Sequence, residues 1–163
     1  MEDKELTIRS IQPSDNDGIF KLIQGILESY NLDKPGTAYY DPYLDKLYDF
    51  YQVEPKSDYW VITKDGRVYG GIGIYPFGDY DNIAEVQKYY LSQEIQGLGY
   101  GRKLYNIAEQ FAKEQGYNRL YIETTDKLGK ANDVYSHYGF TKRTKPLDET
   151  EHFLMNIWLE KQI

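Results

Sequence analysis

The stretch Glu94-Ile-Gln-Gly-Leu-Gly-Tyr-Gly-Arg-Lys103 has glycine at every second position from 97 to 101 and opens the longest helix that the sequence predicts, over residues 99–115. Glycine adopts a positive φ easily and lets a ligand approach the backbone closely. The first turn of a helix directs free N–H groups and the positive end of the helix dipole outward, which suits a phosphate. Arg102 and Lys103 add two cationic donors at the same place. The stretch therefore predicts a phosphate-binding turn.

This turn differs from two common phosphate-binding motifs. A GxGxxG dinucleotide motif beginning at Gly97 would need glycine at position 102, where the sequence has Arg102, and the P-loop pattern GxxxxGK[S/T] is absent. The structural alternative is a glycine-rich turn without a ligand. In that alternative nothing would offset the loss of helix stability, which is about 1 kcal/mol for each glycine inside the helix.

The rest of the chain predicts strands and helices in a mixed order. Strands are expected at 6–11, 58–63, 68–75, 84–91, 119–124, 140–142 and 152–159, and helices after residues 13–15, after Asp41, at 99–115 and at 130–137. Asp41 is the expected N-cap of the second helix, with Pro42 at its first position. Gly70, Gly71 and Gly73 predict a bulge, the close approach of a ligand, or tight packing on a helix. Hairpins combined with one βαβ crossover predict an α+β fold, a mixed sheet layered with helices.

Composition bounds the function. A length of 163 residues predicts a single domain, residues 1–163. The chain has no cysteine, which excludes disulfides, thiolate metal sites and cysteine nucleophiles. His137 and His152 are too few for a histidine-built metal site, and both are expected to be surface or sheet residues. The net charge of −7 argues against nucleic acid as a partner. No apolar run of about 18 residues occurs, so we expect no membrane span and a cytoplasmic protein.

Three segments together resemble a known family. Gln96-Gly-Leu-Gly-Tyr-Gly101 resembles the Q/R-x-x-G-x-G/A signature of the GCN5-related N-acetyltransferases (GNAT), whose backbone amides hold the pyrophosphate of acetyl-CoA. Residues 84–91 resemble the fourth strand of the family, and Tyr135-Ser-His-Tyr-Gly-Phe140 resembles its Y-x-x-x-G-F segment. The resemblance extends over residues 6–160. It implies a central mixed, mostly antiparallel sheet with a splayed pair of strands, flanked by about four helices.

The resemblance implies acetyl-CoA-binding residues along one strand and the turn after it. In this family the strand before the signature splays from its neighbour and pairs with pantetheine through backbone groups that would otherwise be orphaned. The implied contacts are Tyr89, Tyr90 and Leu91 for pantetheine, and Gln96, Gly97, Leu98, Gly99, Tyr100, Gly101 and Arg102 for pyrophosphate. The sequence departs from the family at one position. Many members have an asparagine seven residues before the tyrosine that corresponds to Tyr135, whereas this chain has Leu128 there, and its nearby Asn132 is out of register.

Two residues have implied catalytic roles. Tyr135 matches the tyrosine that protonates the departing CoA thiolate, and a phenol of pKa about 10 is a suitable donor. Its alternative role is packing. Glu85 matches a general-base glutamate of members that acetylate protein lysines, since an ammonium of pKa about 10.4 must lose a proton before it attacks. The alternative is that Glu85 is a strand residue without a chemical role.

The stretch 30–51 is expected to bind the acceptor. It interleaves six tyrosines with four aspartates, and aromatic faces beside carboxylates suit ammonium groups. The acidic chain also attracts cations. The expected contacts are Tyr40, Asp41, Tyr43 and Asp45. The alternative is a loop that folds over the sheet with aspartate caps and tyrosine anchors.

The function implied by the resemblance is an acetyl-CoA-dependent N-acetyltransferase without a metal. It would move an acetyl group to a primary amine of a small molecule or peptide, expected to be cationic, by direct transfer in a ternary complex. Two alternatives are a catalytically silent CoA-binding or sensor domain, and an interaction domain that uses residues 30–51 as its contact surface. The sequence leaves open the acceptor, the acyl group, and a monomeric or homodimeric state.

Overall fold

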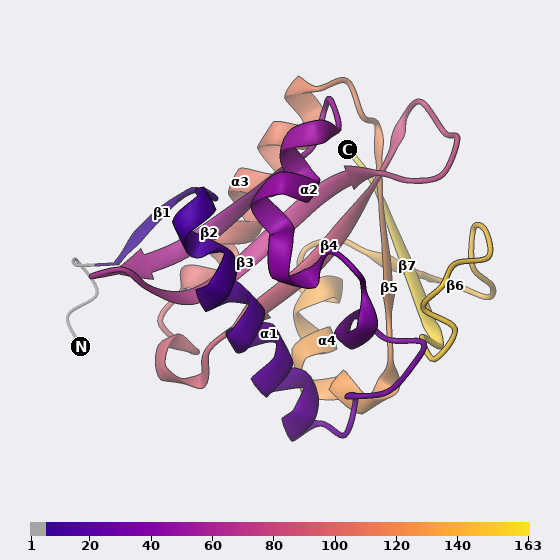
Figure 1. Ribbon diagram of the computed structural model, residues 1–163. Coiled ribbons are helices and arrows are strands. Elements are labelled where there is room, and N and C mark those ends of the chain that lie inside the picture. Colours follow the sequence, from indigo (N-terminus) through magenta and orange to yellow (C-terminus); the bar gives the residue numbers. More distant parts are fainter. Residues whose placement is uncertain (1–5) are drawn as a thin grey trace.

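One sheet organises the chain (Figure 1). The computed structural model describes residues 6–163, with the backbone alone for Lys130, so the first five residues of the expected domain lie outside the description. Within that range seven strands lie in the order β1-β2-β3-β4-β5-β7-β6, accompanied by four α-helices. The strands are β1 (Thr7–Ser10), β2 (Asp58–Lys64), β3 (Arg67–Pro76), β4 (Ile83–Leu91), β5 (Arg119–Thr124), β6 (Thr141–Arg143) and β7 (Ile157–Gln162). The helices are α1 (Asn16–Ser29), α2 (Leu47–Val53), α3 (Tyr100–Glu114) and α4 (Gly129–His137).

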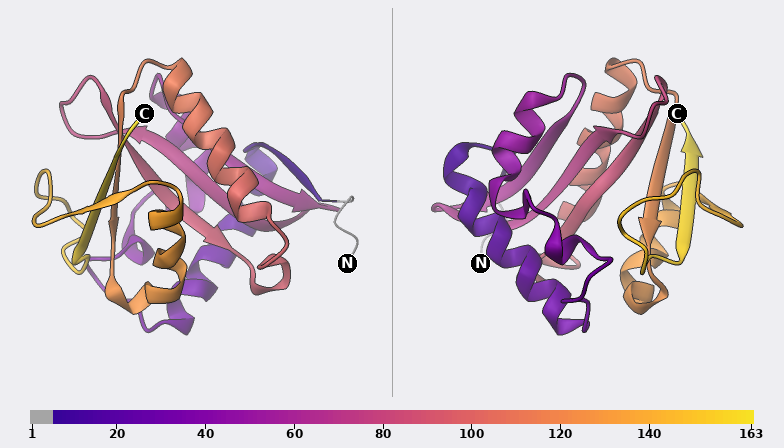
Figure 2. Two further views of the ribbon diagram at one scale, coloured as in Figure 1. Left: turned by 180° about the vertical axis from the view of Figure 1, so that it is seen from behind. Right: turned by 45° about the vertical axis from the view of Figure 1, so that its right-hand side comes forward.

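The helices cover both faces of the sheet. Helices α1 and α2 lie on one face, and α3 and α4 lie on the other (Figure 2). Helix α1 buries Ile19, Ile23 and Leu27, which are spaced four residues apart and so share one side of the helix. Because both faces are covered, β2 and β3 are buried without alternation, as in the run 59–63 of β2. None of the helices in residues 6–163 is long and apolar enough to cross a membrane.

Strands β4 and β5 form the one parallel pair among the described strands, and they pair only at their beginnings. Ile83–Glu85 of β4 align with Arg119–Tyr121 of β5, and β5 then continues along β7. Beyond Glu85 the two strands diverge, as the right-hand view of Figure 2 shows. The edge of β4 that faces β5 therefore has no strand partner from Val86 onward. This arrangement confirms the expected mixed, mostly antiparallel sheet with a splayed pair and four helices.

The three glycines of β3 make room for tyrosines. A Cβ on Gly71 would lie 2.4 Å from the ring of Tyr59, and one on Gly73 would lie 2.4 Å from the hydroxyl of Tyr51. Two of the three interpretations of these glycines are therefore observed: tight packing, against tyrosines of β2 and α2, and a bulge, since the register of β3 with β4 shifts between Gly71 and Gly73. The register shift lies opposite them, where β4 bulges and Lys88 has a φ of +50°.

Two expected boundaries are wrong. The second helix begins at Leu47 instead of Pro42, because Asp41 turns inward to pair with other side chains and does not cap a helix. The last strand begins at Ile157 instead of residue 152. Residues 144–156 form a loop that lies against the α1–α2 connection, and this loop contains His152. The expected helix 99–115 and strand 119–124 are confirmed by α3 and β5.

Candidate active site

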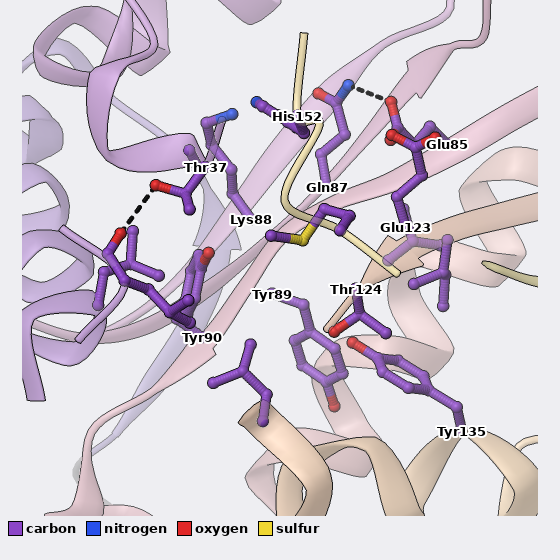
Figure 3. A pocket seen from close by; sticks show the side chains of 17 residues that line it. Thr37, Glu85, Gln87, Lys88, Tyr89, Tyr90, Glu123, Thr124, Tyr135 and His152 are labelled. Atoms are coloured by element: carbon purple, nitrogen blue, oxygen red, sulfur yellow. Dashed lines mark hydrogen bonds between the residues drawn. The ribbon is translucent and has the colours of Figure 1, made fainter. Parts of the chain in front are cut away.

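A pocket lies where β4 and β5 diverge. Its walls come from β4, from the end of β5, from α4, from the α1–α2 connection and from loop 144–156. Figure 3 shows Glu85, Gln87, Lys88 and His152 at one end of this pocket, and Tyr89, Thr124 and Tyr135 at the other. Segments far apart in the sequence thus contribute polar side chains to a single site.

The glycine turn joins the end of β4 to α3. Gly97 and Gly99 have φ values of +81° and +88°, and no atom lies within 4 Å of the position where either Cβ would be. Gly99 is the N-cap of α3 and has no side chain to bond the first-turn amides. Helical geometry leaves the N–H groups of Gly101 and Arg102 without an acceptor inside the helix. An exposed backbone with free donors and a left-handed twist fits an anionic phosphate.

The strand edge beside this turn is fixed by tyrosines. The hydroxyl of Tyr89 donates a 2.6 Å hydrogen bond to the carbonyl oxygen of Gly101 and lies 3.0 Å from the hydroxyl of Tyr138. The guanidinium of Arg102 lies 4.7 Å from the centre of the Tyr138 ring. These contacts tie β4, the first turn of α3 and α4 together at the phosphate end. The unpaired edge of β4 and the turn therefore keep a fixed relative position.

Glu85 lies at the point where the two strands separate. Its Oε1 accepts a 2.8 Å hydrogen bond from Nε2 of Gln87, whose Oε1 accepts a 2.7 Å bond from the Tyr51 hydroxyl. Burial raises the pKa of Glu85 to about 7 and the charge of Glu123 adds to this effect, while Gln87, His152 and Lys88 oppose it. A carboxylate with this pKa changes its protonation state near neutral pH. It is therefore suited to accept a proton.

Tyr135 projects from α4 toward the opposite end of the pocket (Figure 3). Burial raises its pKa well above the usual value, so its hydroxyl is protonated at neutral pH and can donate. Asn132 holds this helix in place: its Nδ2 donates to the carbonyl oxygen of Thr125 at 2.8 Å, and its Oδ1 accepts from Oγ1 of Thr124 at 3.0 Å. The out-of-register asparagine thus connects α4 to the end of β5, while Leu128 lines the pocket.

The four residues expected to bind the acceptor do not come together around the pocket. Tyr40 is 60% exposed, and Asp45 is also exposed. Tyr43 stacks on Phe50 with the ring centres 3.8 Å apart. The carboxylate of Asp41 is buried and already accepts from Lys88 and His152. Asp41 is therefore not free to bind an incoming ammonium. Its residue type and its neighbours in the sequence could not reveal these two partners.

Lys88 and His152 are the pocket residues that the sequence analysis missed. Nζ of Lys88 lies 2.7 Å from Oδ2 of Asp41, and its side chain is 2% exposed. Nε2 of His152 lies 2.8 Å from Oδ1 of the same carboxylate. Burial alone would raise the pKa of Asp41, but the hydrogen bond from His152 and the charge of Lys88 hold it below its usual value. The presence of a lysine within the partly apolar strand 84–91 could have indicated Lys88. Nothing in the sequence indicates that His152 lies in the pocket.

Glu123 of β5 is a third missed residue of the pocket. Its Oε2 accepts from the Tyr121 hydroxyl at 3.0 Å and its Oε1 accepts from Oγ1 of Thr150 at 2.8 Å. These bonds fix a second carboxylate near Glu85. Groups of three or more histidine, aspartate or glutamate side chains with the geometry of a metal site are absent from residues 6–163.

Comparison with known proteins identifies the class. The chain matches the model of the acetyltransferase (GNAT) family over residues 23–140 and belongs to that family. It is 38% identical to an uncharacterized N-acetyltransferase, YjgM, of Escherichia coli, over 89% of this chain and 87% of that protein. It is 25% identical to a putative alanine N-acetyltransferase of ribosomal protein bS18 from Bacillus subtilis, over 81% of this chain and 78% of that protein.

Solved structures of the family share this fold. A GNAT-family acetyltransferase from Staphylococcus aureus matches 96% of this chain and 98% of its own with a TM-score of 0.83 and 20% identity. A structure of yncA from Salmonella typhimurium with its cofactor acetyl-CoA matches 96% of this chain and 93% of its own, with a TM-score of 0.74 and 17% identity. The expected family, the fold and an acetyltransferase activity are thereby confirmed.

Proposed function

We propose that this acetyltransferase moves an acetyl group from acetyl-CoA to a primary amine by direct transfer in a ternary complex. The observation that carries the proposal is the pairing of a base and an acid across one pocket. Glu85, with a pKa of about 7, lies at one end, and Tyr135, whose raised pKa keeps it protonated, lies at the other. The strand edge between them is unpaired.

The proposed cofactor position follows this edge. The amides of 96–102 bind the pyrophosphate, and the backbone of Tyr89, Tyr90 and Leu91 binds the pantetheine arm. Support comes from the open space at Gly97 and Gly99 and from the amides of Gly101 and Arg102, which helical geometry leaves without an acceptor inside α3. The acetyl-CoA in the Salmonella relative is consistent with this choice of cofactor. When bound, acetyl-CoA supplies the acetyl group in activated form, as a thioester.

Glu85 then accepts one proton and Tyr135 donates another. Glu85, directly or through one water, accepts a proton from the acceptor ammonium and so frees the nitrogen lone pair. As the new C–N bond forms and the C–S bond breaks, the sulfur keeps the electron pair of the broken bond. Tyr135 donates its phenolic proton to that sulfur, and the second proton that the nitrogen loses as the amide forms passes through solvent to restore the Tyr135 phenol. An acetyl-cysteine intermediate is excluded, since the chain has no cysteine to carry the group.

The test is release of free CoA thiol in the presence of a library of amines, amino acids and peptides, together with a binding measurement for acetyl-CoA. Amine-dependent thiol release with formation of the acetylated amine is expected. Acetyl-CoA binding without thiol release for any amine would show a silent CoA-binding domain instead. An absence of acetyl-CoA binding would leave an interaction domain as the remaining alternative.

A further inference from the structure

Loop 144–156 is held against the acceptor end of the pocket by contacts on both sides. The N–H of Leu154 donates to the carbonyl oxygen of Gly36 at 3.1 Å, and the N–H of Asn156 donates to that of Thr124 at 2.9 Å. The ring of Phe153 lies 2.7 Å from the position where a Cβ on Gly36 would be. The loop therefore bridges the α1–α2 connection and the end of β5, and it brings His152 into the pocket wall.

One nitrogen of His152 is engaged and the other is available. Nε2 lies 2.8 Å from Oδ1 of Asp41. An ionised carboxylate only accepts, so Nε2 carries a proton. Within the described residues, Nδ1 makes no hydrogen bond, and Arg119 Nε is the one fully buried side-chain polar atom without a partner. His152 lines the pocket, and Nδ1 is the ring nitrogen that remains available to a ligand.

The charges around the ring favour its protonated form. Asp41 of the α1–α2 connection contacts the ring, and the charges of Lys88 and Glu85 on β4 also act on it. Burial alone would lower the pKa of His152, but the hydrogen bond and the charge of Asp41 outweigh burial and Lys88, and the pKa is raised. In the imidazolium both nitrogens donate, so protonation of the ring gives Nδ1 an N–H that carries part of the positive charge.

We propose that His152 Nδ1–H binds a carboxylate of the acceptor, so that the preferred acceptor is an amino acid whose amine faces Glu85. This inference rests on the proposed acetyl transfer and names its acceptor class. His152 and Glu85 are close enough to influence each other electrostatically, and Figure 3 shows them at the same end of the pocket. An amine and a carboxylate separated by few atoms match this pair. A charge-assisted hydrogen bond to an anion is stronger than one to a neutral oxygen, which favours the carboxylate over an amide.

The experiment compares kcat/KM for thiol release with matched pairs of acceptors: L-alanine with ethylamine, L-lysine with cadaverine, and L-phenylalanine with phenethylamine, plus the three amino-acid amides. The amino acids are expected to exceed their decarboxylated partners by roughly 10–100-fold, the range for one hydrogen bond to a charged group. Two variants separate the two ring nitrogens. In His152→Gln the amide nitrogen replaces Nε2 and keeps the contact with Asp41, but the Nδ1 donor is lost.

The His152→Gln variant is expected to lose the preference for amino acids, measured as the ratio of kcat/KM for each amino acid to kcat/KM for its decarboxylated partner. The His152→Asn variant places its amide nitrogen near the position of Nδ1 and retains part of the preference. His137→Gln is the matched control, since His137 is exposed on α4. Equal rates for amino acids and simple amines, equal rates for amino acids and their amides, or an undiminished preference in His152→Gln would each overturn the inference while acetyl transfer stands. Thiol release with none of these acceptors or any amine of the wider library would overturn the proposed function, and this inference with it.

Discussion

The two ends of the pocket are built from different parts of the chain. At the phosphate end, one continuous segment supplies the edge of β4, the glycine turn and the first turn of α3, and the groups offered to a ligand are backbone amides. At the acceptor end, Asp41 of the α1–α2 connection and His152 of loop 144–156 meet through side chains, and Glu85 of β4 lies at the same end of the pocket. The phosphate end is therefore sensitive to backbone conformation, whereas the acceptor end is sensitive to the charge of single residues.

Removal of the proposed acid should have the largest effect. Tyr135→Phe is expected to lower kcat about 10²–10⁴-fold, the usual contribution of a general acid, because the phenolic proton is needed only as the thiolate forms. The affinity for acetyl-CoA should stay the same. Steady-state kinetics and calorimetry measure the two quantities, and Tyr117→Phe, whose hydroxyl bonds the carbonyl oxygen of Lys56, is the control. An unchanged kcat would assign Tyr135 to packing alone.

The buried ion pair at the acceptor end should dominate stability. Asp41→Asn leaves the Lys88 ammonium, 2% exposed, without its charge partner. Breaking a buried pair in this way costs about 3–5 kcal/mol of the free energy of unfolding. Asp45→Asn is the matched control, since Asp45 is exposed and its loss should stay within about 0.5 kcal/mol. Urea denaturation of both variants measures the difference, and equal stability would mean that the Asp41–Lys88 pair contributes nothing to the fold.

The phosphate end should fail when its backbone is changed. Gly99→Val places a β-branched residue at a φ of +88° where the bound phosphate would lie. The affinity for acetyl-CoA is expected to fall roughly 100-fold, because one or two hydrogen bonds to a charged group are lost. Gly116→Val imposes similar strain at the other end of α3, where φ is +93° and no atom lies within 4 Å of the Cβ position. Calorimetry with acetyl-CoA on both folded variants distinguishes local strain from loss of the site. Equal acetyl-CoA affinities of Gly99→Val and Gly116→Val would refute the assignment of residues 96–102 as a phosphate-binding turn.

These differences explain what the sequence could predict. The glycine turn, α3 and β5 were predictable because each depends on residues adjacent in the chain: alternating glycines, a periodic apolar face, and a short β-prone run. The splayed pair followed from resemblance to a family and not from the residues themselves. Glu85 and Tyr135 were placed by the same resemblance, and the structure adds the hydrogen bonds and burial that set their pKa values.

The acceptor end could not be predicted from local patterns. Asp41 and His152 are 111 positions apart, and their contact depends on how loop 144–156 crosses the sheet. An aspartate followed by proline is typical of a helix start, so the local pattern at Asp41 indicated a cap. A tertiary ion pair with Lys88 replaced that cap. Lys88 reaches Asp41 from a bulge in β4, where its own φ is +50°, a conformation that no residue pattern at 84–91 indicated.

The pH profile of kcat/KM tests the central claim most directly, which is that Glu85 accepts the proton of the acceptor. A base must be ionised to act, so the wild-type rate should rise with pH and level off above the Glu85 pKa of about 7. In Glu85→Gln this limb should disappear. In Glu123→Gln it should move to lower pH, because the carboxylate of Glu123 raises the pKa of Glu85. A Glu85→Gln enzyme that retains the wild-type limb and rate would contradict the account.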